Sequence, residues 1–453
     1  MLSSLVCLGR HTITGLLCTS GRQLGDWSAD YRLFSQMRFD PGALFGTIRR
    51  GILGHLHQQE PLVVAMDDSL LKKSGTKIPG VAYRRDPLGP PFHINFVRAQ
   101  RILQISAALP HKSTHAPARL IPIDFAHTPT ASKPRKNSPP QAWQEYHRLR
   151  QELNLSRQGA ARLKGLRQAL EADEPNKKRA LWVAVDGRFT NSTILKGLPD
   201  LTTLIGRVRA DAKLYYPPEP NAPSQRGRKR QYGHLAPTPE ALRKDPSIPW
   251  HTLEVFAAGK LHKLKIKTLA PLLWRTAGPA LPLRLIAIAP LAYRPKKGSR
   301  LLYRKPAYLI CTDPRQALQR IIQAYFWRWD IEVNFRDEKQ LLGVGQAQVR
   351  NESSVEAAPA LAVAAYAILL LAAAKAFGST SQPYSLPPPK WRRNKEKPRA
   401  STSDLISHLR AELWGKALGQ SNFSHFMHEH IPDTKPENYL PHLPSAVLYA
   451  VNS

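Results

Sequence analysis

The stretch PLVVAMDDS at residues 61–69 is a short apolar run that ends in two neighbouring acids. A second stretch, LWVAVDG at residues 181–187, has the same pattern and ends in Asp186. Continuous apolar runs of this length predict strands that are buried on both faces of a sheet. Because adjacent strand ends bring their side chains together, Asp67 and Asp186 are expected to lie close to each other. The simpler interpretation is that each acid only caps a strand and keeps its end soluble.

Further periodic segments complete a recognisable order along the chain. Strands are expected at residues 92–98, 101–109 and 201–208, a polar helical stretch at 141–172 and a short helix at 191–197. The order strand, strand, strand, helix, strand, helix, strand is that of a ribonuclease-H-like fold. The sequence therefore predicts an α/β protein with a ribonuclease-H-like catalytic core.

A third acid stands on a helix that is predicted over residues 315–340. At about 100° per residue, Tyr325, Arg328, Glu332 and Lys339 fall within about 60° of arc. A carboxylate between an arginine and a lysine stays ionised and can hold a metal, while the cations can bind phosphate. The alternative is a network of ion pairs on an exposed helix.

The spacing Y-x2-R-x3-E-x6-K resembles the signature of the DDE transposases of bacterial insertion sequences, specifically the group named after insertion sequence four. The resemblance implies that Asp67, Asp186 and Glu332 are catalytic and bind two Mg²⁺ (or Mn²⁺) ions, which carboxylate oxygens favour. It also implies that Tyr325, Arg328 and Lys339 contact phosphates of the element's end.

As for activity, the resemblance implies binding of terminal inverted repeats, metal-dependent cleavage and strand transfer into target DNA. It further implies a homodimer on the DNA ends, cleavage through hairpinned ends and a bacterial, nucleoid-associated location in the cytoplasm. Two alternatives stay open: a nuclease of the same fold without strand transfer, and an inactive DNA-binding protein derived from an element.

The first acid has a rival, since Asp67 and Asp68 are neighbours and alternate residues of a strand point to opposite faces. The resembled family tends to have D-x-[ST] here, which Asp67-Asp68-Ser69 matches with Asp67 as the ligand. Asp67 is therefore preferred. Two aromatic residues beside the signature, Trp327 and Trp329, are expected in the core, with stacking on a base as the alternative.

The chain is strongly basic, with 66 Lys and Arg against 33 Asp and Glu, a net charge of 66 − 33 = +33. Such an excess points to a polyanion partner, DNA or RNA, and the resemblance implies double-stranded DNA. Two basic clusters are expected to contact DNA. One follows the first strand and the other lies in a basic run, and they comprise Lys72, Lys73, Lys77, Arg84 and Arg85, and Arg228, Lys229 and Arg230.

The chain divides into five expected parts. Residues 1–60 are helical, with DNA-end binding and simple packing as their two interpretations. Residues 61–208 form the first part of the catalytic core, 209–314 a basic β-rich insertion of the kind that the resembled transposases carry, 315–378 the helices with the glutamate signature, and 379–453 a Pro-rich basic linker and C-terminal segment.

Other classes of protein fit the sequence less well. The apolar stretch 357–374 is rich in Ala and contains Pro359, which favours a buried core helix over a membrane span. No secretion signal is evident, and three cysteines without zinc spacing fit a reducing cytoplasm. The histidines His425, His428 and His430 are expected on the surface rather than at a metal.

Overall fold

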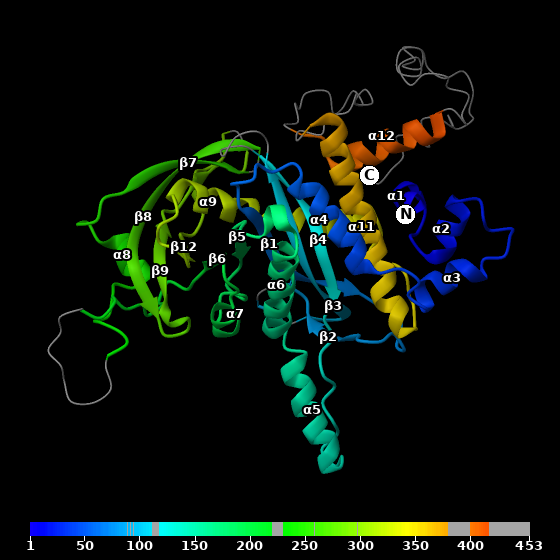
Figure 1. Ribbon diagram of the computed structural model, residues 1–453, viewed down its shortest axis with the longest axis horizontal. Coiled ribbons are helices and arrows are strands. Elements are labelled where there is room, and N and C mark those ends of the chain that lie inside the picture. The colour runs from blue at the N-terminus through cyan, green and yellow to red at the C-terminus, as the bar shows by residue number, and fades with distance from the viewer. Residues whose placement is uncertain are drawn as a thin grey trace.

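The computed structural model describes residues 1–87, 89–90, 92–93, 95–110, 117–219, 230–257, 259–296, 298–378 and 399–415. One mixed sheet runs through them in the order β2-β3-β1-β5-β6-β12-β9-β8-β7, with β4 paired to β3 (Figure 1). Its strands are β1 (Leu62–Lys72), β2 (Ala82–Arg85), β3 (Phe96–Pro110), β4 (Ala118–His127), β5 (Leu181–Val185), β6 (Thr202–Arg207), β7 (His251–Ala257), β8 (Lys260–Trp274), β9 (Gly278–Ile288) and β12 (Ala307–Cys311). The short strands β10 (Ala292–Tyr293) and β11 (Leu302–Tyr303) pair separately.

The centre of this sheet confirms the predicted ribonuclease-H-like fold. Strands β1, β5 and β6 are parallel, and β3 lies antiparallel between β1 and β4. The parallel strands β1 and β5 are buried on both faces over their apolar runs, as the sequence predicts. Helix α6 (Leu155–Glu171) covers one face, where Gly159 approaches Met66, and α10 (Asp330–Gln340) covers the other.

Two of the predicted strands are wrong in their bounds. A single strand, β3, begins inside the predicted segment 92–98 and includes all of 101–109, and β4 was not expected. Polar residues interrupt both strands in the sequence, but each has a tertiary partner. Within β3, Gln100 donates to the carbonyl of Pro79 at 2.8 Å, and within β4, Asp124 pairs with Arg162 at 3.1 Å. A search for alternating apolar and polar residues misses such strands, because the partners of their polar residues lie elsewhere in the chain.

The predicted helix at 141–172 is two helices, α5 (Pro140–Glu152) and α6. Asn154 causes the break, since its side chain accepts hydrogen bonds from the amides of Ser156 and Arg157 and so caps the start of α6. The short helix α7 (Ser192–Lys196) and strand β6 lie where the sequence predicts them.

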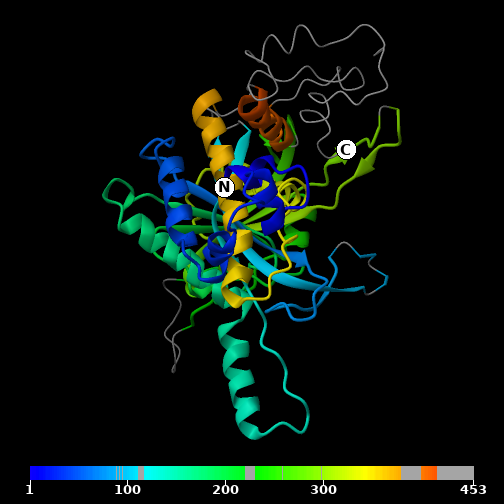
Figure 2. The same cartoon turned by 90° about the vertical axis from the view of Figure 1, so that its right-hand side faces the viewer.

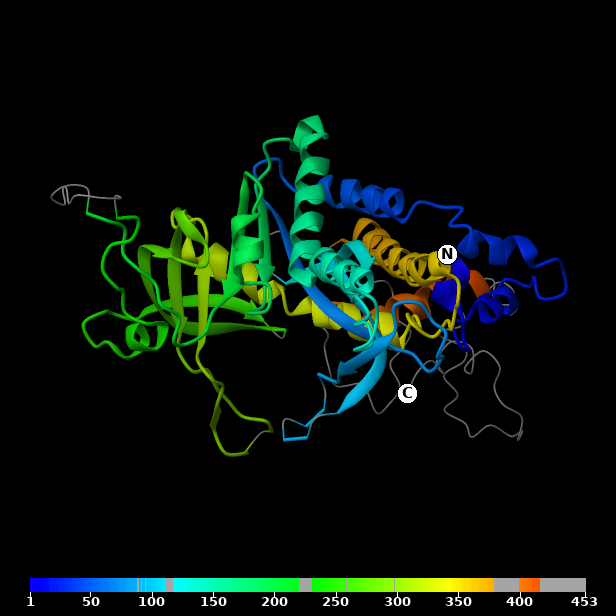
Figure 3. The ribbon, with the colours of Figure 1, turned by 90° about the horizontal axis from the view of Figure 1, so that it is seen from below.

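The predicted insertion continues the central sheet rather than forming a sheet of its own. Strand β12 pairs antiparallel with β6, and β9, β8 and β7 follow outward from it, while α8 (Pro239–Lys244) packs on β8 and β9. Seen from below, these strands extend the sheet at one end of the molecule, and the N-terminal helices lie at the other (Figure 3).

The N-terminal region is helical, with α1 (Leu2–Val6), α2 (Ile13–Thr19), α3 (Ser28–Ser35) and α4 (Pro41–Leu53). Helices α1, α3 and α4 pack on α11 (Glu352–Phe377), and α12 (Thr402–Gly415) packs on α1 and α11. Within the described part of the chain, α11 is the one helix that is long and apolar enough to cross a membrane, and 61% of its most apolar window is buried inside the protein. The predicted C-terminal linker lies mostly outside the described residues.

Candidate active site

Asp67 lies where the parallel pairing of β1 with β5 ends, one residue after Met66 pairs with Val185. The antiparallel partner β3 continues beside it, with Asp67 opposite Gln104, so β1 runs on to Lys72 instead of ending at the acids. The residue is 7% exposed and faces α10. The sheet therefore presents this carboxylate at its carboxyl edge, inside a crevice.

Asp186 follows the last residue of β5 and sits in a tight turn. Its Oδ1 accepts the amides of Arg188 at 2.9 Å and Phe189 at 3.3 Å, and its carbonyl accepts the hydroxyl of Thr190 at 2.8 Å. These bonds fix the orientation of the carboxylate without any long side chain.

Glu332 lies in the first turn of α10, and its side chain is exposed. The predicted helix 315–340 is broken here into α9 (Leu318–Trp327) and α10. The amides of residues 328, 329, 331 and 332 each bond to the carbonyl three residues before, which is the tighter 3₁₀ pattern. The regular spacing of 100° per residue does not hold across this turn. The direction in which the four signature residues point therefore follows from their contacts and not from the spacing.

Those contacts bring the signature to β1. The Arg328 guanidinium lies 3.2 Å from Oδ2 of Asp67, with both side chains nearly buried, and its carbon lies 5.6 Å from the centre of the Tyr325 ring. The Lys339 ammonium donates to the Ser69 hydroxyl at 2.6 Å. Since Asp67 and Ser69 point to the same face of β1, α10 lies along the acidic side of the strand.

Electrostatics ties the three acids together. The pKa of Asp67 is raised to about 7, mainly by burial and then by the charge of Asp186, with a smaller contribution from Glu332. The charge of Arg328 and the hydrogen bond from the Asp68 amide oppose this shift. Among the described residues, no three His, Cys, Asp or Glu side chains are close enough to hold a metal ion between them. Arg328 occupies the Asp67 carboxylate instead, so a positive charge already lies where three carboxylates repel one another.

The chemistry of the three acids nonetheless suits a divalent cation, although a bound ion would have to draw them closer together. The donor set is made of carboxylate oxygens, which suit Mg²⁺ or Mn²⁺. A cation would relieve the repulsion by Asp186 and Glu332 that adds to the effect of burial on the pKa of Asp67. Release of Arg328 from Oδ2 would free that oxygen for the cation.

Asp68 points to the opposite face, toward α6, as alternation requires. Both of its oxygens accept from Nη1 of Arg188 at 2.9 Å, and its side chain is 7% exposed. Burial raises the pKa of Asp68, and Arg188 opposes that shift most strongly. Arg188 was not singled out from the sequence, although its place two residues after Asp186 was a signal for it.

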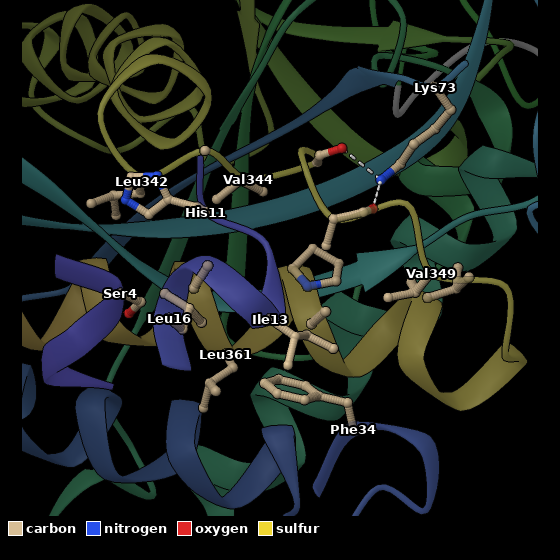
Figure 4. A pocket seen from close by; sticks show the side chains of 17 residues that line it. Ser4, His11, Ile13, Leu16, Phe34, Lys73, Leu342, Val344, Val349 and Leu361 are labelled. Carbon is tan, nitrogen blue, oxygen red and sulfur yellow. Dashed lines mark hydrogen bonds between the residues drawn. The ribbon is translucent and has the colours of Figure 1, made fainter. Parts of the chain in front are cut away.

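One of the expected DNA contacts is wrong. Lys73 is 8% exposed, and its ammonium donates to the carbonyls of Gly345 at 2.7 Å and Ala347 at 2.8 Å. It borders a cavity of about 40 Å³ between the N-terminal helices and the loop after α10, together with His11 and Phe34 (Figure 4). Burial lowers the pKa of Lys73 to about 8. This lysine ties β1 to the loop and is closed to DNA.

Three of the basic residues expected after the first strand are open to solvent. Lys72 pairs with Asp86 at 3.1 Å but keeps 65% of its side chain exposed, and Arg85 and Lys77 are exposed as well. Arg84 is half-buried and donates to the carbonyl of Ala99 at 3.3 Å. In the second cluster, Arg230 is exposed, while Arg228 and Lys229 lie outside the described residues.

The two tryptophans of the signature differ. Trp327 is half-buried against the core, in line with the expectation, whereas Trp329 is 66% exposed, which corrects it. The helix break at residues 328–329 leaves Trp329 exposed to solvent, three residues before Glu332. The residues that line a cleft of about 810 Å³ include Gly187, Arg207, Arg209 and Trp274.

A further buried acid lies behind the site. Glu338 of α10 is 1% exposed and accepts from the side chain of Gln104 at 2.9 Å, and Gln104 lies directly opposite Asp67. Burial raises the pKa of Glu338 to about 8. Its place in the helix carries no motif, and only the tertiary structure reveals it.

One comparison with known families gives a match. A family model described as DDE superfamily endonuclease matches residues 2–270, which is more than half of the chain. None of the curated proteins that were compared matches it. The matched part contains Asp67 and Asp186 but ends before α10, so the placing of Glu332 rests on the contacts described above.

Proposed function

This chain belongs to the DDE superfamily of endonucleases, and we propose that it is the transposase of a bacterial insertion sequence. Membership of the superfamily implies DNA as substrate and the use of divalent metal ions. The finer proposal is supported by one observation above all. The Tyr-Arg-Glu-Lys signature, which lies beyond the matched region, meets the strand of the first aspartate through the Arg328–Asp67 and Lys339–Ser69 contacts.

In this proposal Asp67, Asp186 and Glu332 bind two Mg²⁺ or Mn²⁺ ions, which would stabilise the attacking and leaving oxygens at a phosphodiester. Asp186 is held for this role by the two amide hydrogen bonds to its Oδ1. Asp67 is preferred over Asp68 because the charge of Glu332 acts on it in addition to that of Asp186. The charge of Asp186 also acts on Asp68, but Arg188 engages Asp68 on the other face of the strand.

Three residues of the signature would hold the DNA backbone. Arg328 lies against Asp67 and, once released from it, its guanidinium is placed to bind a phosphate beside the reacting one. Tyr325 packs under that guanidinium and limits its movement. Lys339 reaches the far end of the same face at Ser69.

The path of the DNA beyond the reacting phosphate would follow the exposed cations Lys72 and Arg85 and the half-buried Arg84. In the insertion it would follow Arg230 and its sequence neighbours Arg228 and Lys229. The net charge of +33 supports such a path. Binding of terminal inverted repeats, strand transfer, a homodimer on the DNA ends and a nucleoid-associated location in the cytoplasm all belong to this proposal.

The test uses the purified full chain and labelled DNA that carries the sequences flanking its own coding region. With Mg²⁺ or Mn²⁺ we expect cleavage at a defined boundary and, with supercoiled plasmid added, joined products. Glu332→Gln should abolish both. Glu352→Gln is the matched control, since Glu352 is also an exposed acid in the first turn of a helix.

Each alternative has its own outcome. Metal-dependent cleavage without joined products would favour a nuclease of the same fold. Tight DNA binding without cleavage in any metal would favour an inactive DNA-binding protein. Cleavage that survives in Glu332→Gln would remove Glu332 from the proposed metal ligands.

A further inference from the structure

A protruding arm leaves the body of the protein between β4 and α6 (Figures 1 and 2). It consists of the connecting segment 129–139, helix α5 and residues 153–154, and we call residues 129–154 the arm. No residue of α5 is buried. Since burial of apolar surface is what normally holds a surface helix against its domain, nothing comparable draws α5 toward the sheet.

The arm starts at the same end of the sheet as the acids. Strand β4 is parallel to β1, and His127 aligns through Ile102 of β3 with Ser69, two residues beyond Asp67. The following residue, Thr128, is fully buried, and its amide donates to the carbonyl of Arg101 at 2.8 Å. The base of the arm is thus anchored at the level of the active site.

The other end of the arm returns to the second aspartate. Ser156, just after the arm, accepts a hydrogen bond from the side chain of Asn191 at 2.9 Å, and Asn191 belongs to the loop that follows Asp186. Arg84, one of the cations on the proposed DNA path, donates to the hydroxyl of Thr130 at 3.4 Å. The arm therefore extends a surface that already borders the site.

The charge of the arm is positive and is carried mainly by its connecting segment. The arm has five Lys and Arg and two Glu, a net charge of 5 − 2 = +3. Segment 129–139 holds Lys133, Arg135 and Lys136, all exposed, and contains no acid. On the helix, by contrast, Arg148 is paired with Glu145 at 2.6 Å and Glu152 at 2.7 Å.

The aromatic side of α5 is turned toward the connecting segment. Trp143 and Tyr146 are half-buried with ring centres 6.0 Å apart, and the Lys133 ammonium lies 5.9 Å from the Trp143 ring. The segment and the helix thus stiffen each other. What the arm offers outward is a polar, cationic surface, which suits a phosphate backbone better than the apolar face of a second protein.

We propose that the arm grips the backbone of duplex DNA that flanks the scissile phosphate, by means of Lys133, Arg135 and Lys136. This inference rests on the proposed function, because it needs DNA at the acids. A helix of this length spans about 20 Å, so the arm would reach roughly six base pairs beyond its base. The contacts are to phosphates and carry no sequence preference.

The test measures binding of the full-length protein to a fluorescein-labelled 30-base-pair duplex of arbitrary sequence over a range of salt. The arm variant replaces Lys133, Arg135 and Lys136 by Gln. The control variant replaces Lys164, Lys177 and Lys178 by Gln, which removes the same charge from exposed residues of α6 and of the loop before β5. Lys177 and Lys178 precede β5, at the end of the sheet opposite the acids.

Loss of three phosphate contacts should lower the slope of log affinity against log salt by about 2–3. We expect this change in the arm variant, with a roughly 10- to 100-fold weaker affinity at low salt, and a slope change of less than about 1 in the control. A photo-crosslinking residue at Asn137 should also join to the duplex, whereas one at Glu174 should not.

Equal losses in both variants would overturn the inference in favour of bulk charge, and so would unchanged binding by the arm variant. Loss of self-association in the arm variant, seen by sedimentation without a change in the salt slope, would overturn it in favour of a protein partner. Failure of the proposed function is separable, because the wild-type protein itself would then not nick plasmid with Mn²⁺. Failure of the inference alone leaves that nicking in place and appears only in the comparison of the two variants.

Discussion

The Arg328 guanidinium lies 3.2 Å from the carboxylate of Asp67, across 261 positions of sequence. Both side chains are nearly buried, so solvent screens the attraction between their charges only weakly. In the proposed enzyme the same carboxylate binds a metal ion and the same guanidinium binds a phosphate. The ion pair is therefore a closed form of the site in which each group satisfies the other.

Replacement of Arg328 should separate these two roles. In Arg328→Gln the competitor for Asp67 is gone, so we expect Mn²⁺ to bind roughly tenfold more tightly, as measured by titration calorimetry. DNA cleavage should nonetheless fall by about 10²–10³, since the buried cation that binds the phosphate beside the reacting one is lost. Arg336→Gln is the control, because Arg336 lies on the same helix with 57% of its side chain exposed. Weaker Mn²⁺ binding in Arg328→Gln would contradict the closed-site interpretation.

The stability of the metal-free protein should depend on the ionisation of Asp67. Its pKa is raised from 3.8 to about 7. When the pKa of an acid is higher in the folded than in the unfolded state, the acid is protonated in both states at low pH and does not affect stability. At high pH it is ionised in both states, which costs more free energy in the folded state. Its destabilising effect therefore grows as the pH rises from about 4 to about 7, and by linkage reaches at most about 4 kcal/mol.

Asp67→Asn removes that dependence. In the presence of chelator, the free energy of unfolding of the variant relative to wild type should increase between pH 5 and pH 8, as measured by urea denaturation. Comparing the two proteins at each pH cancels the titration of all other groups. A difference that stays constant over this range would show that Asp67 titrates near its ordinary pKa.

The Asp68–Arg188 pair should position the second aspartate. Arg188 donates through its backbone to Asp186 and through its side chain to Asp68, so it links the turn after β5 to β1. Arg188→Gln leaves the nearly buried Asp68 without its cation, and we expect a loss of about 1–3 kcal/mol in stability. Mn²⁺ affinity should fall as well, since the Asp186 turn is no longer fastened.

Exchange of the two charges provides the control. In the double variant Asp68→Arg with Arg188→Asp, part of the lost stability should return relative to either single variant, as a double-mutant cycle would show. Additive effects of the two substitutions would mean that the pair has no positioning role.

Lys73 and Arg85 should behave in opposite ways. Lys73→Met leaves the carbonyls of Gly345 and Ala347 without their donor, and we expect a lower melting temperature, with about 1–3 kcal/mol lost and an unchanged salt slope for DNA. Arg85→Gln should leave the melting temperature unchanged and lower the salt slope by about 1. Equal DNA binding in wild type and Arg85→Gln would remove Arg85 from the proposed path.

Much of the candidate site could be predicted because it depends on short-range patterns. Asp67 and Asp186 each end an apolar run, and a parallel sheet brings such ends to one edge. The order β5, α7, β6 follows from periodicity as well, whereas the order before it does not, because the two segments predicted at 92–98 and 101–109 lie in the single strand β3 and β4 was not expected. The spacing of Tyr325, Arg328, Glu332 and Lys339 predicted that they share one face of a continuous helix. Because the helix is broken between Trp327 and Asp330, their common orientation is supported by the contacts of Arg328 and Lys339 with β1 instead.

What only the tertiary structure decided is which polar groups are matched by partners far away in the chain. In the sequence Lys73 looks like a surface lysine, but in the structure the loop after α10 buries it. Nothing in the sequence distinguishes Glu338, which is buried against Gln104. Strand β4 and the junction of β12 with β6 escaped prediction for the same reason. By itself the sequence determined the apolar framework and the acids at its edge, since burial follows local patterning. The pairing of buried polar groups depends on which residues come close together in space, and only the tertiary structure determines that.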